Sequence, residues 1–299
     1  MHIVNRATSH DVALETTLLV HGVPRESSMA LHHELAGVVR AHKVNPALIG
    51  LVNGAPTVGM QDEELELLLA SGDVPKLNTA NLAPHVHRGG HGATTVSATM
   101  ELAALAGVRV FATGGIGGVH TGYGEKLDIS SDLAAFTRFP VAVVGSGVKS
   151  ILDVRATREA LEALGVTVIG YRTDAFPAFY TRESDAGVDA RFDDPMELAS
   201  FLRSELSRTG RGVLVTNPIP EEHEIDAAQF DEWHRKVVAN VNAKGITGRG
   251  VTPAILGGLH EISGGKTLSA NIELVKSNAD LAAQIAAQMR EDELKSKRA

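Results

Sequence analysis

Short apolar runs rich in β-branched residues recur along the chain, and they constrain its fold more than any other feature. They span residues 14–20, 47–53, 108–113, 141–145, 166–171 and 212–216. Most of these runs are continuously apolar rather than alternating, which is typical of strands covered on both faces of a parallel sheet. Helical patterns fall between them, so we predict a layered α/β fold with a largely parallel sheet.

The segments between and after these runs predict helices. Asp194 and Pro195 are a typical start for a helix over residues 196–206, and Ser28 is expected to cap an amphipathic helix. Beyond Pro220 the chain becomes mainly helical. A last apolar stripe recurs at three- and four-residue steps and comprises Ile272, Val275, Ala279, Ala282, Ala286 and Met289. Packing of this helix on the body of the protein is favoured over packing on a neighbouring subunit.

No internal repeat or linker divides the 299 residues, so we predict a single domain over residues 1–299. The net charge of -8 argues against a nucleic-acid or membrane surface. The lack of cysteine excludes disulfides and thiolate metal sites. Neither a signal-peptide pattern nor an apolar run of about 20 residues is present. We therefore expect a cytoplasmic protein whose partner is a small molecule.

The glycine-rich turns do not match the common nucleotide-binding sequence motifs. GSGVKS at residues 145–150 has Val148 where a P-loop has glycine, and GGKT at residues 264–267 has His260 at its leading position. The glycines of GGIGGVH do not complete G-x-G-x-x-G, because His120 occupies the last position. Kinase and dinucleotide functions are therefore not predicted.

Lys149 is a candidate for covalent chemistry. It follows the apolar run 141–148 and precedes Ile151 and Leu152, so partial burial of its amine is expected. An amine with little water around it is more readily neutral and can attack carbon, as Schiff-base enzymes require. Position alone leaves the ordinary alternative open, namely a surface lysine at a strand-to-helix turn.

Glu15 is expected inside an otherwise apolar strand, where a carboxylate is unfavourable unless it is paired or protonated. Burial raises the pKa of a carboxyl group, which suits a general acid. His21 and Gly22 follow at the expected strand end, where sites in α/β proteins usually lie.

Asp128 and Asp132 are four residues apart and would share one face of a helix. With Ser130 and Ser131 they could bind a hard cation and a phosphate or ribose. Alternatively, Asp128 or Ser130 caps a helix that begins near Leu133, and spacing alone favours neither reading. Small and hydroxyl residues at 92–99 precede a predicted helix over residues 100–106 and could expose backbone amides to an anion.

Motifs follow one another in order over residues 13–279: ALETT, HGVP, VPKLN, GATTVSATM, VFATGGIGGVH, DISSD, SGVKSILD, TNPIP and SANIELVKSNA. The most specific are GGIGGVH, DISxD and GVKSILD. Together they resemble the pseudouridine-5'-phosphate glycosidase family, also called the indigoidine synthase A-like family. The resemblance implies a three-layer α/β/α core with a helical C-terminal part, a homotrimer and a divalent cation such as Mn²⁺.

The resemblance also implies reversible cleavage of the C–C glycosidic bond of pseudouridine 5'-phosphate to uracil and ribose 5-phosphate. By position in the motifs, Lys149 would be the nucleophile that forms an imine with ribose C1', Glu15 the proton donor and Asp128 the metal ligand. Contacts to the substrate are implied for Lys76, Val96, Ser130, Ser131, Asp132, Thr113, His120 and Asn271. An imine suits this bond, because protonation of a heteroatom leaving group cannot break a C–C link.

Two segments, residues 25–28 and 85–91, depart from the family pattern, and they bear on the base that is accepted. His85, His87 and His91 lie in the second segment, where a polar loop is favoured over a metal site. The alternative hypothesis is a metal-dependent N-glycoside or phosphoester hydrolase acting on a related nucleotide. In that case Lys149 would only bind phosphate.

Overall fold

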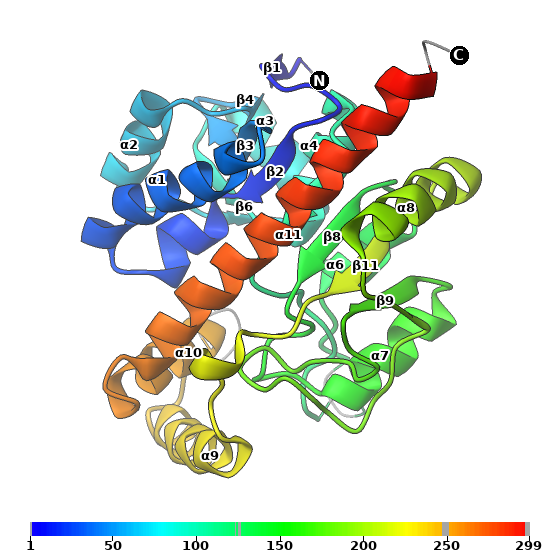
Figure 1. Ribbon diagram of the computed structural model, residues 1–299. Helices are drawn as coiled ribbons and strands as arrows, with labels where there is room; N and C mark the ends of the chain where they lie inside the picture. The colour runs from blue at the N-terminus through cyan, green and yellow to red at the C-terminus, as the bar shows by residue number, and fades with distance from the viewer. Residues whose placement is uncertain (1, 123, 125–126, 247–250, 297–299) are drawn as a thin grey trace.

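A mixed, mostly parallel sheet forms the centre of the computed structural model, which describes residues 2–122, 124, 127–246 and 251–296 (Figure 1). Its strands are β1 Val4–Asn5, β2 Val12–Glu15, β3 Pro46–Val52, β4 Ala55–Val58, β5 Lys76–Leu77, β6 Gly92–Thr94, β7 Val110–Ala112, β8 Ala142–Gly145, β9 Thr167–Tyr171, β10 Ala190–Phe192 and β11 Val213–Thr216. The strand order is β1-β4-β3-β2-β7-β8-β11-β9-β10, with β6 beside β3 and β5 beside β6. Among the strands named here for the described residues, only β4 and β6 pair antiparallel, both with β3.

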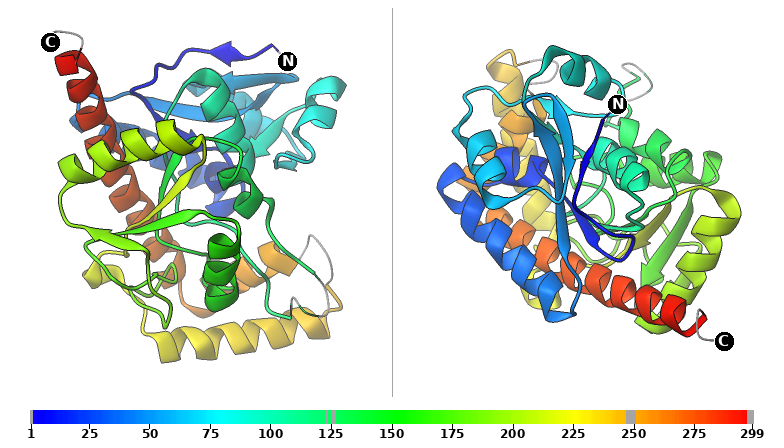
Figure 2. Two further views of the ribbon diagram at one scale, coloured as in Figure 1. Left: turned by 90° about the vertical axis from the view of Figure 1, so that its right-hand side faces the viewer. Right: turned by 90° about the horizontal axis from the view of Figure 1, so that it is seen from above.

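Helices cover both faces of this sheet. The helices are α1 Arg25–Ala41, α2 Asp62–Ala70, α3 Leu82–Arg88, α4 Val96–Ala106, α6 Ser131–Phe136, α7 Val154–Ala163, α8 Pro195–Thr209, α9 Ala227–Ala243, α10 Val251–Ile262 and α11 Lys266–Ser296. Of these, α9 packs on α10, and α10 packs on α11. The long helix α11 packs against β2, β7 and β8, with α1 and α8 on either side of it (Figures 1 and 2). Helices α4 and α6 pack together on the other face. The predicted three-layer α/β/α arrangement with a helical C-terminal part is confirmed.

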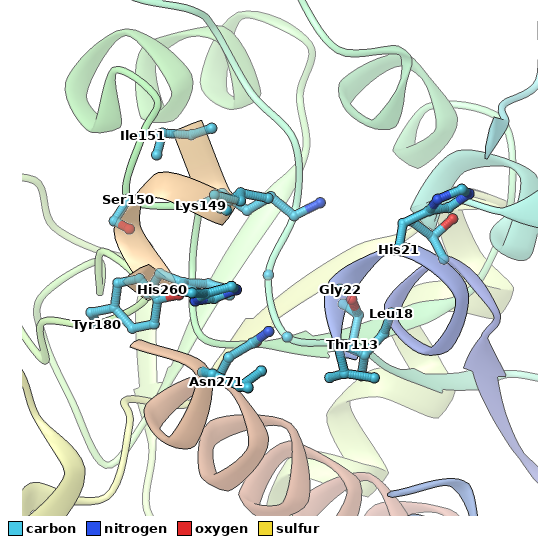
Figure 3. Close-up of a pocket in the computed structure, with 18 of the residues that line it drawn as sticks. Leu18, His21, Gly22, Thr113, Lys149, Ser150, Ile151, Tyr180, His260 and Asn271 are labelled. Carbon is cyan, nitrogen blue, oxygen red and sulfur yellow. The ribbon is translucent and has the colours of Figure 1, made fainter. Parts of the chain in front are cut away.

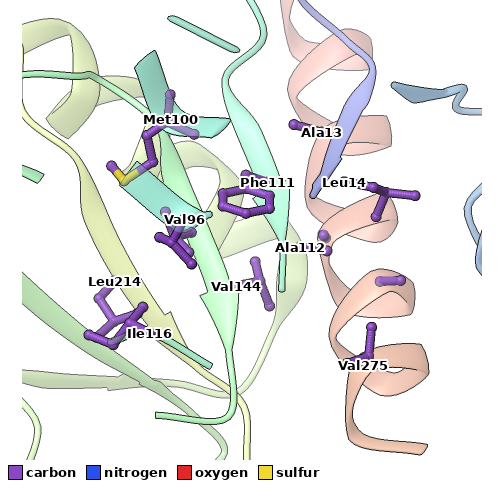
Figure 4. Packing of buried hydrophobic residues seen from close by; sticks show 14 of the residues in the cluster. Ala13, Leu14, Val96, Met100, Phe111, Ala112, Ile116, Val144, Leu214 and Val275 are labelled. Atoms are coloured by element: carbon purple, nitrogen blue, oxygen red, sulfur yellow. The ribbon is translucent and has the colours of Figure 1, made fainter. Parts of the chain in front are cut away.

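The central strands are buried on both faces, as their continuously apolar sequences predict. Phe111 and Val144 lie in the sheet between Val275 of α11 on one side and Met100 of α4 on the other (Figure 4). All of β2, β7, β8 and β11 is buried. Ala279 and Ala286 of α11 are also buried, so the C-terminal stripe packs on the body of the protein. Within the described residues, no helix is long and apolar enough to cross a lipid bilayer.

One predicted strand is wrong in a way that matters for the site. The run at residues 14–20 is a strand only as far as Glu15, and a short π-helix, Leu18–Gly22, follows. Thr16 and Thr17 use their hydroxyls to bond the carbonyls of Ile49 and Thr94, at 3.0 and 2.7 Å, so the chain leaves the strand there. Glu15 is therefore the last residue of a strand and not an interior one.

The predicted helix starts are partly confirmed. The Asp194 side chain accepts a hydrogen bond from Met196 N and opens α8, and Ser130 caps α6 by accepting one from Asp132 N. Ser28 does not cap α1. The helix begins three residues earlier at Arg25, and the buried Ser28 hydroxyl donates to the carbonyl of Leu19 instead.

Two further helix predictions need correction. Helix α4 begins at Val96, earlier than the predicted start at residue 100. The segment with His85 and His87 is helix α3, where a polar loop was expected. A left-handed glycine, Gly89 with φ 72°, ends that helix.

Candidate active site

Neighbouring parallel strands bring three candidate side chains to one edge of the sheet. Strand β2 ends at Glu15, Thr113 directly follows β7, and Lys149 follows β8 after a glycine turn. The carboxyl ends of adjacent parallel strands meet at the same edge, where ligands of α/β proteins bind. All three residues line one cavity of about 300 Å³ (Figure 3).

The cavity lining combines charged, aromatic and apolar groups. Besides the three residues at the strand ends, it includes Leu18, His21, Val23, Lys76, Ile151, Phe179, Tyr180, Leu256, His260, Leu268 and Asn271. In Figure 3, His260 and Asn271 point into the cavity from one side, and His21 and Leu18 lie across from them. The lining therefore offers ionic groups for a charged part of a ligand and apolar surface for an uncharged part.

Glu15 is buried and held by a short hydrogen bond. The Thr113 hydroxyl donates to Glu15 Oε1 at 2.5 Å. Burial raises the pKa of Glu15, while Lys149, the Thr113 hydrogen bond and Lys76 lower it and Asp132 raises it. The balance is a pKa above the ordinary value, so the carboxyl group can hold a proton at higher pH than an exposed glutamate.

Lys149 is placed by a tight turn after β8. Its backbone N–H donates to the carbonyl of Ile116 at 3.1 Å, and Val148 bridges to Ile116. Gly147 has φ 77°, and a side chain there would overlap the carbonyl oxygen of Pro177. The turn therefore requires glycine, and it delivers a half-buried lysine into the cavity.

Lys76 is a second amine in the same cavity. It begins β5, and Asn81 donates a 3.0 Å hydrogen bond from its side chain to the Lys76 carbonyl. Burial and the neighbouring charge of Lys149 lower the pKa of Lys76, and Glu15 partly opposes them. Two amines and one carboxyl group thus share a small volume, which is the setting in which proton exchange between side chains is expected.

Four other predicted site residues lie at the starts of α4 and α6 and are not part of this cavity lining. Asp132 accepts hydrogen bonds from Ser97 N at 2.9 Å and Gly117 N at 2.8 Å, and Ser131 Oγ lies 3.0 Å from Ser97 Oγ. Ser130 caps α6. Val96 is buried in the core. The hydrogen bonds of Ser131 and Asp132 join the start of α6 to the start of α4 and to Gly117. Direct contacts of these four residues with a substrate stay a prediction.

Asp128 is the predicted metal ligand. Its side chain is 64% exposed, and Oδ2 lies 3.9 Å from Nδ1 of His120. In the described parts of the chain, no group of three or more His, Asp or Glu side chains is arranged to hold a metal. A hard divalent cation that keeps several waters needs only one or two carboxylates from the protein. An exposed Asp128 beside His120 fits that kind of site.

Three residues that line the cavity were not predicted from the sequence as site residues. His260, Tyr180 and Phe179 line it, yet none belongs to a motif whose chemistry points to them. His260 was noted only as a mismatch in a failed P-loop. The segments that depart from the family pattern, residues 25–28 and 85–91, do not line the cavity.

Comparison with known proteins gives consistent matches over nearly the whole chain. Residues 4–288 match the family model described as Indigoidine synthase A like protein. A protein of Methylobacterium nodulans named Pseudouridine-5'-phosphate glycosidase is 48% identical over 280 residues, which is 93% of this chain and 83% of that protein.

Two solved structures share the fold. An indigoidine synthase A-like protein from Thermotoga maritima superposes with a TM-score of 0.89 at 35% identity, covering 97% of each chain. The prealnumycin C-glycosynthase AlnA, in complex with ribulose 5-phosphate, superposes with a TM-score of 0.87 at 36% identity. That superposition covers 95% of this chain and 93% of AlnA.

Proposed function

The chain belongs to the family of indigoidine synthase A-like proteins, and on this premise we propose that it is a pseudouridine-5'-phosphate glycosidase. The reaction is the reversible cleavage of the C–C glycosidic bond to give uracil and ribose 5-phosphate. The observation that carries the proposal is the convergence of Lys149, Glu15 and Lys76 in one cavity at the carboxyl ends of parallel strands. A relative named as a glycosidase and a neighbour named as a C-glycosynthase support both directions of such a reaction.

Lys149 acts first in the cleavage direction. Its neutral Nζ attacks ribose C1', and the C1'–O4' bond breaks as the ring opens. Protonated Glu15 gives its proton to O4', which leaves as a hydroxyl group. The raised pKa of Glu15 supports this role, because more of the carboxyl group is protonated than in an exposed glutamate. The product is a secondary ammonium in which C1' still carries the base.

The C–C bond breaks in the second step. The ammonium returns a proton to the Glu15 carboxylate, and Glu15 then protonates C5 of uracil. The nitrogen lone pair of Lys149 forms C1'=N as the C1'–C5 bond breaks, and the bonding electrons stay with the protonated base. Water hydrolyses the iminium to the ribose 5-phosphate aldehyde and the Lys149 ammonium, which returns a proton to the Glu15 carboxylate and so restores the neutral amine and the protonated acid. In the reverse direction the imine forms first and uracil C5 attacks it.

The remaining polar groups bind and orient the substrate. Lys76 pairs with the phosphate, and binding energy there positions C1' against Lys149. Asp128, with His120 nearby, would hold a divalent cation, which would supply positive charge for the binding of the phosphate. A homotrimer, which the sequence resemblance implies, stays a prediction that light scattering checks.

Borohydride trapping tests the covalent step. Incubation with ribose 5-phosphate and borohydride should add one reduced sugar phosphate to the protein, and peptide mapping should place it on Lys149. Lys244→Ala is a matched control, because this lysine is exposed and lies outside the cavity. Wild-type protein without an adduct, or an adduct that persists in Lys149→Ala, would refute the proposed imine.

Substrate comparison separates the proposal from the hydrolase alternative. Pseudouridine 5'-phosphate should be cleaved, and uridine 5'-phosphate, which has an N-glycosidic bond, should not be. Equal turnover of the two nucleotides would favour a metal-dependent N-glycoside hydrolase. Release of inorganic phosphate would favour a phosphoesterase.

A further inference from the structure

His260 is a polar side chain of the cavity to which the reaction described above gives no role. It lies on α10 and points into the cavity beside Asn271 of α11 (Figure 3). Its Nδ1 is 2.7 Å from the Thr267 hydroxyl at the start of α11. Its Nε2 has no hydrogen-bond partner among the residues that the structure describes. One ring nitrogen is therefore anchored, and the other is available to a ligand.

A chain of hydroxyl groups holds the imidazole in place. Thr267 is buried, and its Oγ1 lies 3.0 Å from Ser263 Oγ. Ser263 Oγ also donates to the carbonyl of His260 at 3.3 Å. When the Thr267 hydroxyl donates to Nδ1 of His260, the ring hydrogen is on Nε2, and the group presented to the cavity is then a neutral N–H donor.

We propose that His260 determines base specificity by donating a hydrogen bond from Nε2 to a carbonyl oxygen of the pyrimidine-dione base. The inference rests on the proposed function and adds to it the residue that recognises the uracil base, which is the leaving group. Thr267 is the positioning residue, since it acts on the base only through the imidazole.

The surroundings of His260 favour a neutral base over a phosphate. Leu256 lies one helical turn before His260 and Leu268 follows Thr267, and both line the cavity. Burial lowers the pKa of His260 below its ordinary value, which favours the neutral ring at pH 7. A neutral donor beside apolar side chains suits a planar, uncharged heterocycle. A phosphate dianion is better bound by the Lys76 amine, to which the proposed reaction assigns it.

Kinetics in the synthetic direction test the proposal, because uracil and ribose 5-phosphate are then separate substrates. His260→Ala should raise KM for uracil about five- to tenfold, as expected for one lost neutral hydrogen bond. KM for ribose 5-phosphate and the borohydride-trapped adduct on Lys149 should stay within about twofold of wild type. His260→Gln, whose amide N–H lies near the position of Nε2, should recover most of the uracil affinity.

Two further variants and two base analogues sharpen the test. Thr267→Val, which frees the ring without removing it, should give an intermediate rise in KM for uracil. Glu261→Ala is the matched control, because Glu261 is the exposed neighbour of His260 on the same helix and does not line the cavity. Wild type should discriminate against 2-thiouracil or 4-thiouracil, since sulfur is a weak acceptor, and His260→Ala should lose that discrimination.

The possible failures are distinguishable. A normal adduct on Lys149 with an unchanged KM for uracil in His260→Ala would overturn only the role of His260. An equal rise of KM for both substrates would show that His260 merely supports the cavity, and it would overturn the proposal as well. Absence of an adduct in wild-type protein would overturn the proposed function together with this inference.

Discussion

The Thr113 hydroxyl donates a 2.5 Å hydrogen bond to Glu15 Oε1 and joins the carboxyl ends of the adjacent strands β7 and β2. Asn278 of α11 holds Thr113 from the other side, by donating to the Thr113 carbonyl at 2.8 Å. Glu15 Oε2 has no hydrogen bond to any described residue. One carboxyl oxygen is therefore fixed by the fold, and the other is left for the substrate.

Glu15→Gln should reduce turnover by about 10²- to 10⁴-fold, the range expected when a general acid is removed. The amide keeps the shape of the side chain and can still accept the Thr113 hydrogen bond. Binding of ribose 5-phosphate should therefore change little. Steady-state kinetics and equilibrium binding check the two expectations separately, and near-normal turnover would contradict the proton-donor role.

The same variant makes the stability effect of Glu15 measurable. The pKa of Glu15 is raised above its ordinary value of 4.5. The contribution of the Glu15 side chain to the free energy of unfolding is therefore fully present below pH 4.5. That contribution is lost as the pH rises through the folded-state pKa. Glutamine does not titrate, so Glu15→Gln should gain stability relative to wild type over that window. Chemical denaturation at a series of pH values tests this, and a difference that shrinks with rising pH would contradict it.

Lys149→Ala should abolish turnover, with a loss of at least about 10³-fold, because no other group replaces a covalent nucleophile. The fold should persist, since the turn is held by backbone contacts of Ile116 and by Gly147. Circular dichroism and the thermal unfolding midpoint serve as controls. Substantial activity in a well-folded variant would rule out the assigned role.

Lys76→Met should weaken binding of ribose 5-phosphate by about 10- to 100-fold, the cost of a charge-assisted hydrogen bond. KM for uracil should change much less, which is the reverse of the pattern expected for His260→Ala. Loss of this positive charge should also raise the pKa of Glu15 further, since Lys76 lowers it. Kinetics with each substrate varied in turn test the assignment, and a selective effect on uracil would contradict it.

Gly147→Ala should destabilise the protein by about 2 kcal/mol or more and remove most activity, because the new methyl group would overlap the Pro177 carbonyl. Gly210→Ala is the matched control. Gly210 also has a positive φ of 65°, but a Cβ there would meet no atom within 4 Å, so about 1 kcal/mol and normal activity are expected. Denaturation and activity are measured on both variants. Equal effects would show that backbone conformation alone explains the requirement for glycine.

Asp128→Ala should leave the metal-free protein as stable as wild type, because the side chain is 64% exposed. The Mn²⁺ concentration needed for half-saturation should rise at least about tenfold. Electron paramagnetic resonance titration of free Mn²⁺ measures binding without an activity assay. Unchanged Mn²⁺ affinity would place the cation elsewhere.

Local sequence signals were informative where local physics controls the structure. Continuous apolar runs identified β3, β7, β8, β9 and β11 within one or two residues, because strands covered on both faces need apolar side chains throughout. Asp194 was predicted as a cap, and Ser130 was one of two candidate caps for its helix. In each case the side chain accepts a hydrogen bond from the amide two residues further along.

Signals failed where distant contacts override local preference. The run at residues 14–20 has strand composition throughout, yet Thr16 and Thr17 bond Ile49 and Thr94, which lie far along the chain. Ser28 has the chemistry of a cap, but its hydroxyl bonds the carbonyl of Leu19 instead. No property of these short segments specifies those partners.

By itself, the sequence determined the layered α/β architecture and, through its motifs, the family, and it predicted catalytic roles for Lys149 and Glu15. The tertiary structure alone decided that Glu15 ends its strand and that His260 faces the cavity from α10. It also places Lys76, which the motifs implied as a substrate contact, in the lining of that cavity. These relations join residues that are far apart in the chain. Their positions follow from strand order and helix packing, and no local pattern of residues encodes them.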